Sequence, residues 1–562
     1  MIAGTRWWGL AVGALALGIA ACGTSTPAAA PAAPSGAGGP QQPAANTPPP
    51  VNRVVMALNP PRVESNAMRL LTQTDFWQLR STYEYLTGVD AQNGRVVPQL
   101  ASGWVIDPDG TTVRFKLQSG VNFHNGMGAV KAGDIIYSMK EVLKLDTPGG
   151  TSPYFKDLFK DMQAPSDSEF VLTFKRPDAN LLINVGMQGG GVEVRSEKDG
   201  LAKGDASMQG TPTVGTGPYQ YDSRQQASNI RFKQAPGKHW RATPDFPEFE
   251  FRFVKEASTR LAALLANEVH LVTLPNDLLP QAEKQGYKLL RSRAAGLRTF
   301  LEFLCCFFNE ARNPASGRAH AESPLWDVKV RQALSKAIDR NALNKAFFGG
   351  KGEMMYLNHF HPTRLGWDPN WEKRFPDEYG YDPARAKQIL VESGYGPNNP
   401  LKANVLVQGL VQFNGAEDLA EAAAAAWRAI GVDVTLQVMD SAALVALRNQ
   451  QKFESQIEVV GTASDLYTGT QIYASMSGNR TRGIEDPEVY SRLEAPYSTL
   501  DDKKAEPGWR ALGEAIFTRH SDIPLFWLPV EVVVNPKIVA DYVFPGSLSD
   551  VWTHIENVKA AR

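Results

Sequence analysis

The chain has 562 residues, with 58 Lys and Arg against 59 Asp and Glu and a hydrophobic share of 43%. This balanced charge excludes the strongly basic surface that binds nucleic acid, and the length exceeds what one small core supports. Only 3 cysteines are present, which excludes a disulfide framework and a Cys-x-x-Cys zinc site. We expect several lobes with room to bury a ligand, and no nucleic-acid partner.

The N-terminus has the layout of a secretory signal. Arg6 precedes an apolar run from Trp7 to Ile19, and small residues lead to Cys22. The run is shorter than the roughly 20 residues that span a bilayer, so it predicts export rather than a membrane helix. Ile19-Ala20-Ala21-Cys22 resembles the bacterial lipobox, which implies a signal peptide over residues 1–21 and a lipid on Cys22. A plain signal with an incidental cysteine is the alternative.

Residues 22–52 are expected to be a disordered tether. From Gly23 to Asn52, Pro, Ala and Gly supply 20 of 30 residues, and no residue is charged. Such a composition cannot bury a core, and a flexible linker of this length reaches on the order of 30 Å. The tether would hold a folded domain clear of a membrane.

Beyond Arg53, strand and helix patterns alternate, which predicts α/β or α+β lobes. Residues 54–58 form a short apolar run, and residues 111–117 alternate as a half-buried strand does. Residues 132–143 have a helical pattern. Three polar residues stand where further helices are expected to begin: Ser258, Asp327 and Asp382.

The clearest unit is a predicted strand–helix–strand in the C-terminal third. An apolar strand over 403–407 precedes an Ala-rich helix from Ala416 to Ile430, which Gly431 ends. The run from Val432 to Val438 then alternates apolar and polar residues. This βαβ pattern predicts at least one sheet covered by helices.

Five phrases stand out in chain order: Val96–Gly126, the Gly-Thr-Gly-Pro-Tyr turn within Val214–Tyr219, the helix Val330–Arg340, Tyr381–Tyr395 and Ile523–Leu525. In this order they resemble the family 5 extracellular solute-binding proteins, the peptide, nickel and oligosaccharide receptors of ABC importers. The resemblance covers nearly everything from Arg53 onward, and a lipoprotein head fits the same setting.

The resemblance implies an α/β, periplasmic-binding-protein-like fold with mixed sheets covered by helices. Two lobes would close on the ligand, and one lobe is extra. The implied division is 53–95, 215–295 and 523–562 for lobe I, 96–214 for lobe II, and 296–522 for lobe III. The chain would cross between lobes I and III twice, which makes a hinge beside the ligand cleft.

The sequence lacks a known catalytic or metal-binding string. His-Glu-x-x-His, Gly-x-Ser-x-Gly and Walker A patterns are absent, and the 8 His residues are scattered. His359 and His361 have no acid or Cys at metal spacing, which favours a loop with two solvated imidazoles, and His124 is expected to be structural. We therefore expect no enzyme activity, no cofactor and no metal site.

Cys305 and Cys306 are neighbours in an apolar string. A disulfide between neighbours needs a distorted peptide, so we expect two small buried side chains in a core strand; oxidation is the alternative in an exported protein. By the family analogy this strand enters lobe III after the first crossing. Glu302 beside it is then expected to face either the cleft or solvent.

The main ligand candidate is Asp465. In peptide-binding relatives a lobe III loop reads roughly Gly-Trp-x-x-Asp-x-x-Asp-Pro-x-x-Phe-Leu, and its first Asp pairs with the peptide α-ammonium. The resemblance places Asp465 at that position, although Thr462 replaces the Trp and Thr468-Gly469 replaces the Asp-Pro. A solvated loop acid is the alternative. Tyr467 and Tyr473 are expected either to stack on the ligand or to pack in the core.

The loop after the first strand adds one more candidate, Arg62. In relatives this loop approaches the cleft, so the guanidinium would meet a ligand carboxylate bidentately. Surface solvation is the alternative for Arg62.

The resemblance implies a receptor, lipid-anchored on the periplasmic or extracellular face, that hands its solute to the transmembrane subunits of an ABC permease. An oligopeptide or dipeptide is the first expected ligand. An oligosaccharide, an opine-like compound or a metal chelate is the alternative within the fold, and a surface enzyme or a sensing or assembly lipoprotein is the alternative from another class. We expect a monomer that binds and closes without turnover.

Overall fold

The computed structural model describes the following residues: 49–61, 63–71, 75–89, 96–144, 152–178, 181–186, 191–204, 210–292, 295–408, 415–439, 443–444, 446–447, 453, 455–463, 483–499, 501–542 and 554–562. All of them belong to one compact unit, Ala44–Arg562. The predicted signal peptide, Cys22 and most of the tether lie outside the described residues. None of the described helices has the length and apolar character needed to cross a bilayer.

The first sheet collects strands from three distant parts of the sequence. Its order is β12-β21-β11-β1-β10-β9-β8, and the predicted strand at 54–58 is its central member β1. The strands are β1 Arg53–Leu58, β8 Tyr219–Gln225, β9 Asn229–Gln234, β10 Glu248–Phe253, β11 Leu271–Val272, β12 Lys288–Arg291 and β21 Glu531–Val534. β1 runs parallel to β10 and β11 and is buried on both faces, as its unbroken apolar run requires.

Helices cover one face of this seven-stranded sheet. Val55 and Ala57 of β1 pack with Leu261 of α6 (Ala257–Leu265) and Leu279 of α7 (Leu279–Lys284). On the other face Trp77 of α1 (Trp77–Arg80) meets the ring of Phe251 with centroids 4.9 Å apart. Ser258, expected to cap α6, lies inside its first turn instead, because Glu256 holds the N-cap position.

The second sheet is antiparallel, in the order β4-β5-β7-β6. Its strands are β4 Ala101–Ile106, β5 Thr112–Leu117, β6 Phe159–Ser166 and β7 Glu169–Phe174. The helices of this part of the chain are α2 Ala132–Leu143, α3 Ser152–Leu158, α4 Leu181–Asn184 and α5 Glu197–Lys203. Alternate residues of β5 are buried, and α2 spans the predicted helix. Phe115 of β5 and Phe170 of β7 stack with centroids 6.1 Å apart in this core.

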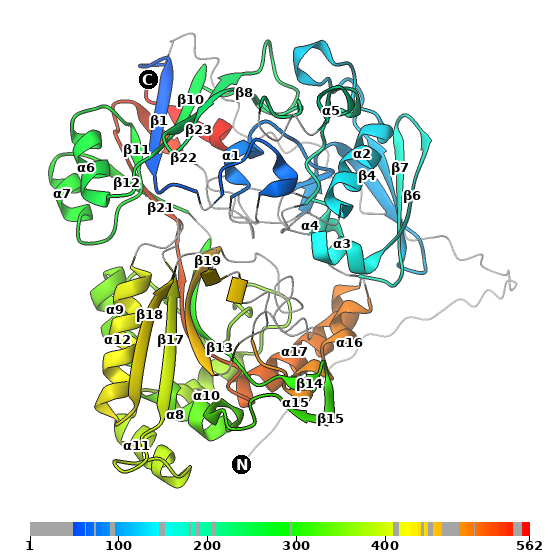
Figure 1. The fold of residues 1–562 in the computed structure, drawn as a ribbon. Helices are drawn as coiled ribbons and strands as arrows, with labels where there is room; N and C mark the ends of the chain where they lie inside the picture. The colour runs from blue at the N-terminus through cyan, green and yellow to red at the C-terminus, as the bar shows by residue number, and fades with distance from the viewer. Residues whose placement is uncertain are drawn as a thin grey trace, which may run out of the picture. The chain divides into compact units, whose positions relative to one another are not determined.

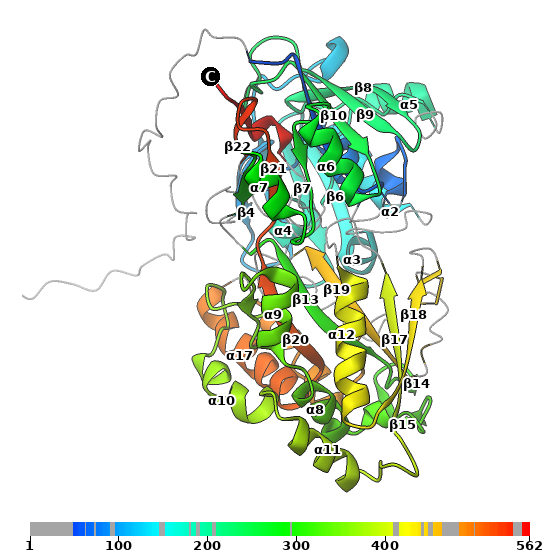
Figure 2. The same ribbon diagram turned by 90° about the vertical axis from the view of Figure 1, so that its left-hand side faces the viewer.

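The third sheet has the order β16-β20-β13-β19-β17-β18. Its strands are β13 Leu297–Leu304, β16 Glu353–Met354, β17 Lys402–Gln408, β18 Asp433–Met439, β19 Gln456–Ala463 and β20 Asp522–Leu528. The predicted βαβ unit is confirmed: β17 and β18 are parallel, and α12 (Ala416–Ala429) lies beside them in Figures 1 and 2. Gly431, with φ of 93°, ends that helix in a conformation suited to glycine.

The other helices near this sheet are α8 Val328–Lys336, α9 Arg340–Phe348, α10 Pro369–Tyr379, α11 Pro383–Glu392, α15 Pro487–Tyr490, α16 Glu494–Tyr497 and α17 Asp502–Thr518. Two predicted caps are confirmed, since the Asp327 and Asp382 side chains accept hydrogen bonds from the backbone N–H groups of Lys329 and Arg385. The remaining strands pair in twos: β2 Thr87–Val89 with β3 Val96–Pro98, β14 Phe308–Glu310 with β15 Asn313–Arg318, and β22 Val539–Tyr542 with β23 Val558–Ala560.

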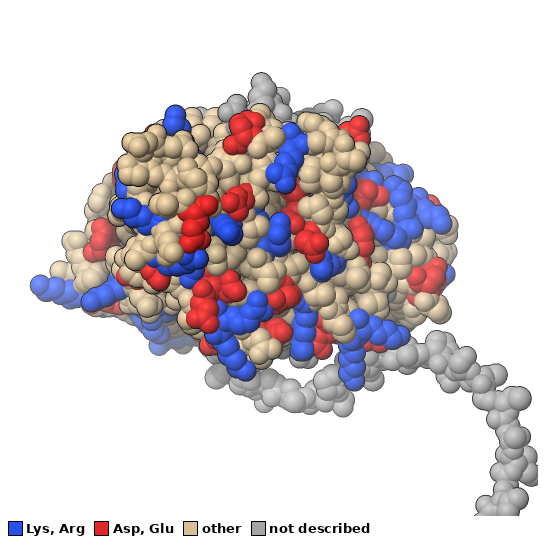
Figure 3. All heavy atoms as spheres, turned by 90° about the horizontal axis from the view of Figure 1, so that it is seen from below, with Lys and Arg blue, Asp and Glu red and all other residues tan. Residues whose placement is uncertain are grey.

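Two expectations differ from the structure. Cys305 and Cys306 are buried as expected, but they follow the end of β13 and form a disulfide with each other. Strand β20 hydrogen-bonds β13 and β16, so residues 523–528 join the six-stranded sheet rather than the seven-stranded sheet of the first predicted lobe. The predicted lobe division otherwise stays a prediction. In Figure 3, acidic and basic side chains are interspersed, as the balanced composition suggested.

Candidate ligand-binding site

Three parallel strands of the six-stranded sheet end at one edge. β17, β18 and β19 are parallel, so their carboxyl ends, Gln408, Met439 and Ala463, lie at the same edge. Leu297, the first residue of β13, pairs there with both Ala463 and Leu528. Ligands of open α/β sheets bind beyond the carboxyl ends of strands, which marks this edge as the candidate site.

Two chain segments run side by side from this edge to the seven-stranded sheet. The first joins β12 to β13, and the second joins β20 to β21. The backbone N–H of Ser292 donates to the Val530 carbonyl at 2.9 Å, and the Val530 N–H donates to the Ser292 hydroxyl at 2.9 Å. Two short crossings joined in this way, as the described Ser292 and Val530 are, have the layout of a hinge.

A buried arginine lies one residue inside the edge. Nη1 of Arg298 on β13 donates to the Asn358 side-chain oxygen at 2.7 Å and lies 2.8 Å from Nδ1 of His359. Its guanidinium carbon is 5.1 Å from the Phe300 ring centroid. His359 was expected to be solvated, and it is instead buried because it shares this contact.

Trp527 of β20 stands opposite Arg298; it packs with Phe300 and Val460 and also contacts polar side chains. The His361 ring meets it edge-on at a centroid distance of 5.4 Å, and the Arg364 guanidinium carbon is 4.7 Å from its centroid. Nε2 of His361 is 3.1 Å from a carboxylate oxygen of Glu353. The Arg364 guanidinium over the buried Trp527 ring is a cation–π contact beside the edge.

Deeper in the same sheet, three carboxyl groups stand in a row across neighbouring strands. Glu302 on β13 pairs in register with Glu458 on β19 and Asp522 on β20. These residues are 4%, 2% and 6% exposed. Burial raises the pKa of Asp522 to about 7, the hydrogen bond from Asn358 opposes the rise, and the charge of Glu302 adds to it. Asn358 donates to Asp522 at 2.8 Å and so joins the acid row to Arg298.

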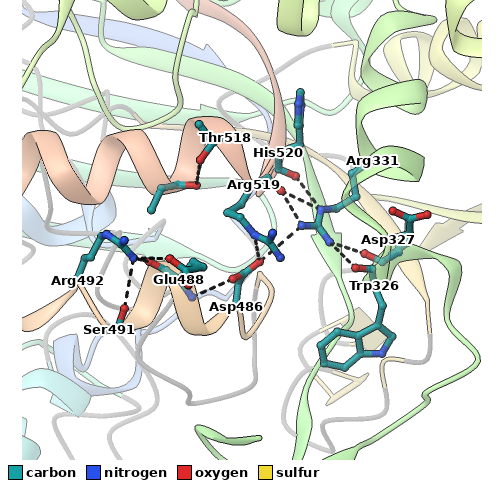
Figure 4. Close-up of polar contacts among 12 residues, drawn as sticks. Trp326, Asp327, Arg331, Asp486, Glu488, Ser491, Arg492, Thr518, Arg519 and His520 are labelled. Atoms are coloured by element: carbon teal, nitrogen blue, oxygen red, sulfur yellow. Dashed lines mark hydrogen bonds and ion pairs between the residues drawn. The ribbon is translucent and has the colours of Figure 1, made fainter. Parts of the chain in front are cut away.

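Another buried arginine anchors the chain near this sheet (Figure 4). Arg331 of α8 donates to the carbonyls of Arg519 at 2.6 Å and His520 at 3.0 Å, just past the end of α17. Asp486 accepts from Nε of Arg519 at 2.7 Å and lies 3.8 Å from Nη2 of Arg331. Positive groups at a helix C-terminus offset its dipole, so Arg331 stabilises the end of α17. Asp486, which is also the N-cap of α15, links that end to the start of α15.

The predicted site residues are only partly located. Glu302 is buried, which argues against the solvated alternative, and it pairs in register with Glu458 and Asp522; its contact with a ligand stays a prediction. Asp465, Tyr467, Tyr473 and Arg62 lie outside the described residues, although β19, which precedes Asp465 in sequence, ends at Ala463 on the candidate edge.

Several polar residues beside the edge were missed in the sequence. Arg298 is the only basic residue in the apolar strand Leu297–Leu304, and such an isolated charge was the signal available. Asn358, Arg364 and Trp527 gave no comparable signal, since tertiary contacts alone bring them to Arg298. The described residues include no group of His, Cys, Asp or Glu arranged to hold a metal.

Comparisons with known proteins agree with this architecture. Residues 95–482 match the family model described as bacterial extracellular solute-binding proteins, family 5 Middle. The chain is 28% identical over 292 residues to the dipeptide-binding protein of Escherichia coli, covering 49% of this chain and 51% of that one. It is 28% identical over 275 residues to heme-binding protein A of Haemophilus influenzae, covering 46% and 47%. The chain thus spans about half the length of the curated relatives it matches.

Solved structures share the fold over most of the chain. The peptide-bound periplasmic binding protein DppA of Helicobacter pylori aligns with a TM-score of 0.73 and 21% identity, covering 91% of this chain and 98% of that one. AgaA of Agrobacterium tumefaciens, solved with agropinic acid, aligns with a TM-score of 0.72 and 19% identity, covering 91% and 99%. These identities support the fold and leave the ligand open.

Proposed function

Because the chain belongs to family 5 of the bacterial extracellular solute-binding proteins, we propose that it captures a solute outside the cell membrane and delivers it to an ABC permease. The observation that carries the proposal is the edge of the six-stranded sheet, where parallel strands end beside two crossings to the seven-stranded sheet. Closure about those crossings would remove water from the ligand, which strengthens its polar contacts.

We propose an oligopeptide or dipeptide as the solute. The support is that similar chains are named dipeptide-binding proteins and that a structural neighbour holds a peptide. A non-peptide solute is the second candidate, since another relative is named heme-binding protein A and AgaA was solved with agropinic acid. In either case the protein would act as a monomer that binds without turnover. A surface enzyme would instead consume its ligand.

The proposed setting is a lipid-anchored protein on the outer side of the membrane. The support is the apolar run that ends at Cys22 and the uncharged stretch after it. Replacing Cys22 by Ala and fractionating the cells tests this: the parent should stay with the membrane until detergent is added, and the variant should not. A variant that remains equally membrane-bound would overturn the anchor.

We also propose the predicted three-lobed division, with its last crossing moved to the segment between Leu528 and Glu531. The support is that β20 ends and β21 begins on either side of that segment, in different sheets.

The capture proposal is tested by screening peptides, sugars and chelates with the purified protein. A ligand at 100 times its Kd should add about 2.7 kcal/mol to the free energy of unfolding, and scattering should show a more compact particle. Ligand carried through purification and identified by native mass spectrometry would name the solute. Consumption of a compound without a melting shift or compaction would overturn the receptor assignment.

A further inference from the structure

A cavity separate from the candidate edge lies between residues 66–83 and the helices α2 and α5. Its volume is about 130 Å³, and its walls include Met68, Tyr83, Tyr137, Lys144, Arg195 and Gly200. An apolar cavity of about 150 Å³ holds a benzene molecule, so this space suits a compound of similar size. Leu201, which is 69% exposed, lies at its rim.

Arg195 is the unusual group in this wall. It is 5% exposed, yet no ion pair joins it to an acid in the described part of the chain. Its side chain donates one long hydrogen bond, from Nη2 to the Ser138 carbonyl at 3.4 Å, and Nε is buried without a partner. Buried charges are normally paired or fully hydrogen-bonded, so Arg195 has bonding capacity left over.

Two other buried arginines show how this protein satisfies a guanidinium that lacks an acid. Arg260 donates to three backbone carbonyls and the Asn59 side-chain oxygen, at 2.7–2.9 Å. Arg340 donates to three carbonyls and the Ser335 hydroxyl, at 2.8–3.3 Å. Among the described residues Arg195 has no such set of acceptors, although it faces a cavity that an acceptor can enter.

Nearby acids act on Arg195 only through space in the described part of the chain. Burial raises the pKa of Glu193 and the charges of Arg80 and Arg195 oppose that rise, yet Glu193 and Arg195 share no hydrogen bond or ion pair there. Lys144 and Glu141 pair with each other at 2.6 Å, so their charges offset one another. Glu193 accepts from the Tyr85 hydroxyl at 2.9 Å, and Asp199 pairs with Lys203 at 2.6 Å. A negative group inside the cavity would give the guanidinium a directly bonded acid, which the described residues do not supply.

Two tyrosines of the cavity wall, Tyr83 and Tyr137, are held in place by close contacts. Tyr83 is held by a hydrogen bond from its hydroxyl to the Thr213 carbonyl at 2.8 Å. Tyr137 lies against Gly200, where an added methyl group would be 2.1 Å from its hydroxyl oxygen. Glycine inside a helix such as α5 weakens that helix. The close approach of Tyr137, which leaves no room for a side chain, explains why glycine stands at position 200.

We propose that this cavity binds a small organic monocarboxylate, with the carboxylate on Arg195 and an apolar body between Tyr83 and Tyr137. A guanidinium pairs bidentately with a carboxylate, and aromatic walls suit a flat or short apolar body. The ligand would touch residues of two predicted lobes at once. This site is separate from the transported solute and does not depend on the proposed transport function.

Benzoate is the probe, and benzamide is its uncharged counterpart of the same size. Calorimetry with the purified parent protein should show saturable benzoate binding and at least about tenfold weaker benzamide binding, equivalent to about 1.4 kcal/mol. The variant Arg195→Gln should lose the preference for benzoate. The variant Gly200→Ala should weaken both probes because the methyl group displaces Tyr137. Arg114→Gln, which changes an exposed arginine on β5, should bind like the parent.

Equal affinity of the parent for benzoate and benzamide would overturn the proposal. Failure to bind benzoate up to about 10 mM would do the same, since this corresponds to less than about 3 kcal/mol of binding free energy. If circular dichroism shows that Arg195→Gln is unfolded, the titrations of the parent and of Gly200→Ala still test the proposal. Benzoate binding that both cavity variants retain would place the compound elsewhere and also overturn the assignment.

Discussion

Glu302 and Asp522 stand directly opposite each other on β13 and β20, and both carboxyl groups are buried. Ionising two neighbouring carboxyl groups that are both buried costs free energy, because neither charge is solvated and the two charges repel. Burial raises the pKa of Asp522 to about 7, even though Asn358 and Arg298 favour its charged form. Asp522 therefore holds a proton up to near-neutral pH.

This raised pKa makes stability depend on pH with a definite sign. Between about pH 4 and pH 7 the folded protein keeps a proton on Asp522 that the unfolded chain has released, so this group stabilises the fold at low pH and loses that contribution as pH rises. Asp522→Asn should flatten the dependence of unfolding free energy on pH, measured by urea titration from pH 5 to pH 8. Asp433→Asn, an exposed control on β18, should leave the profile unchanged. Identical profiles for parent and Asp522→Asn would refute this.

Arg331 is expected to carry a large part of the stability around α17. Arg331→Met leaves the carbonyls of Arg519 and His520 without their buried donor, at an expected cost of about 2–4 kcal/mol in chemical denaturation. Arg492→Met is the matched control, because that arginine is half-buried near the surface and pairs with Glu488, four residues before it, a contact worth about 0.2–1 kcal/mol. Similar costs for the two variants would show that the carbonyl contacts are not stabilising.

The Gly-Thr-Gly-Pro-Tyr turn has a packing explanation. A methyl group on Gly217 would be 2.2 Å from the Ser81 carbonyl oxygen, and the Gly217 carbonyl lies 2.7 Å from Nε2 of His124. Gly217→Ala should therefore destabilise the protein by about 1–3 kcal/mol. Gly103→Ala on β4 meets nothing within 4 Å and should be neutral or slightly stabilising. Melting both variants beside the parent checks this, and an unaffected Gly217→Ala would contradict it.

The five sequence phrases predicted the fold well because their residues contact one another in the structure. His124 of the first phrase bonds the turn at Gly217, and Arg340 of the helix phrase donates to the Pro524 carbonyl of the last one at 2.8 Å. Such contacts hold together segments that are far apart in sequence. The residues that make them form short motifs that can be recognised in the sequence. The βαβ unit was predictable for another reason, since its periodicity and its stop at Gly431 are local signals.

The site was less predictable because its residues meet only in three dimensions. Arg298 and Trp527 are far apart in sequence and come together through the pairing of β13 with β20. Glu302 was visible as an acid in an apolar strand, but the two acids that enclose it come from other strands. The cysteine pair was misjudged because hydrophobic neighbours do not reveal oxidation, while Cys306 adopts φ of 64°, outside the strand conformation.

Asp465 is the single residue on which the proposed peptide ligand depends. Its support is the alignment with the family loop, which supplies an acid two residues after the end of β19. In a closed, water-poor site, loss of the partner of a buried ammonium costs roughly 3–5 kcal/mol, whereas loss of a surface acid costs about 0–1 kcal/mol. This difference is large enough to distinguish a ligand contact from a solvated loop acid.

Asp465→Asn keeps the size of the side chain and removes its charge. The parent, this variant and the exposed control Asp433→Asn are titrated with the identified peptide in free and N-acetylated forms. Acetylation should abolish tight binding to the parent and the control because it removes the ammonium, and Asp465→Asn should bind both forms weakly. If Asp465→Asn binds the free amine within about threefold of the parent, near 0.6 kcal/mol, Asp465 is a loop acid. The peptide assignment would then rest on family likeness alone, while capture of another solute by lobe closure would remain to be judged by its own melting and scattering data.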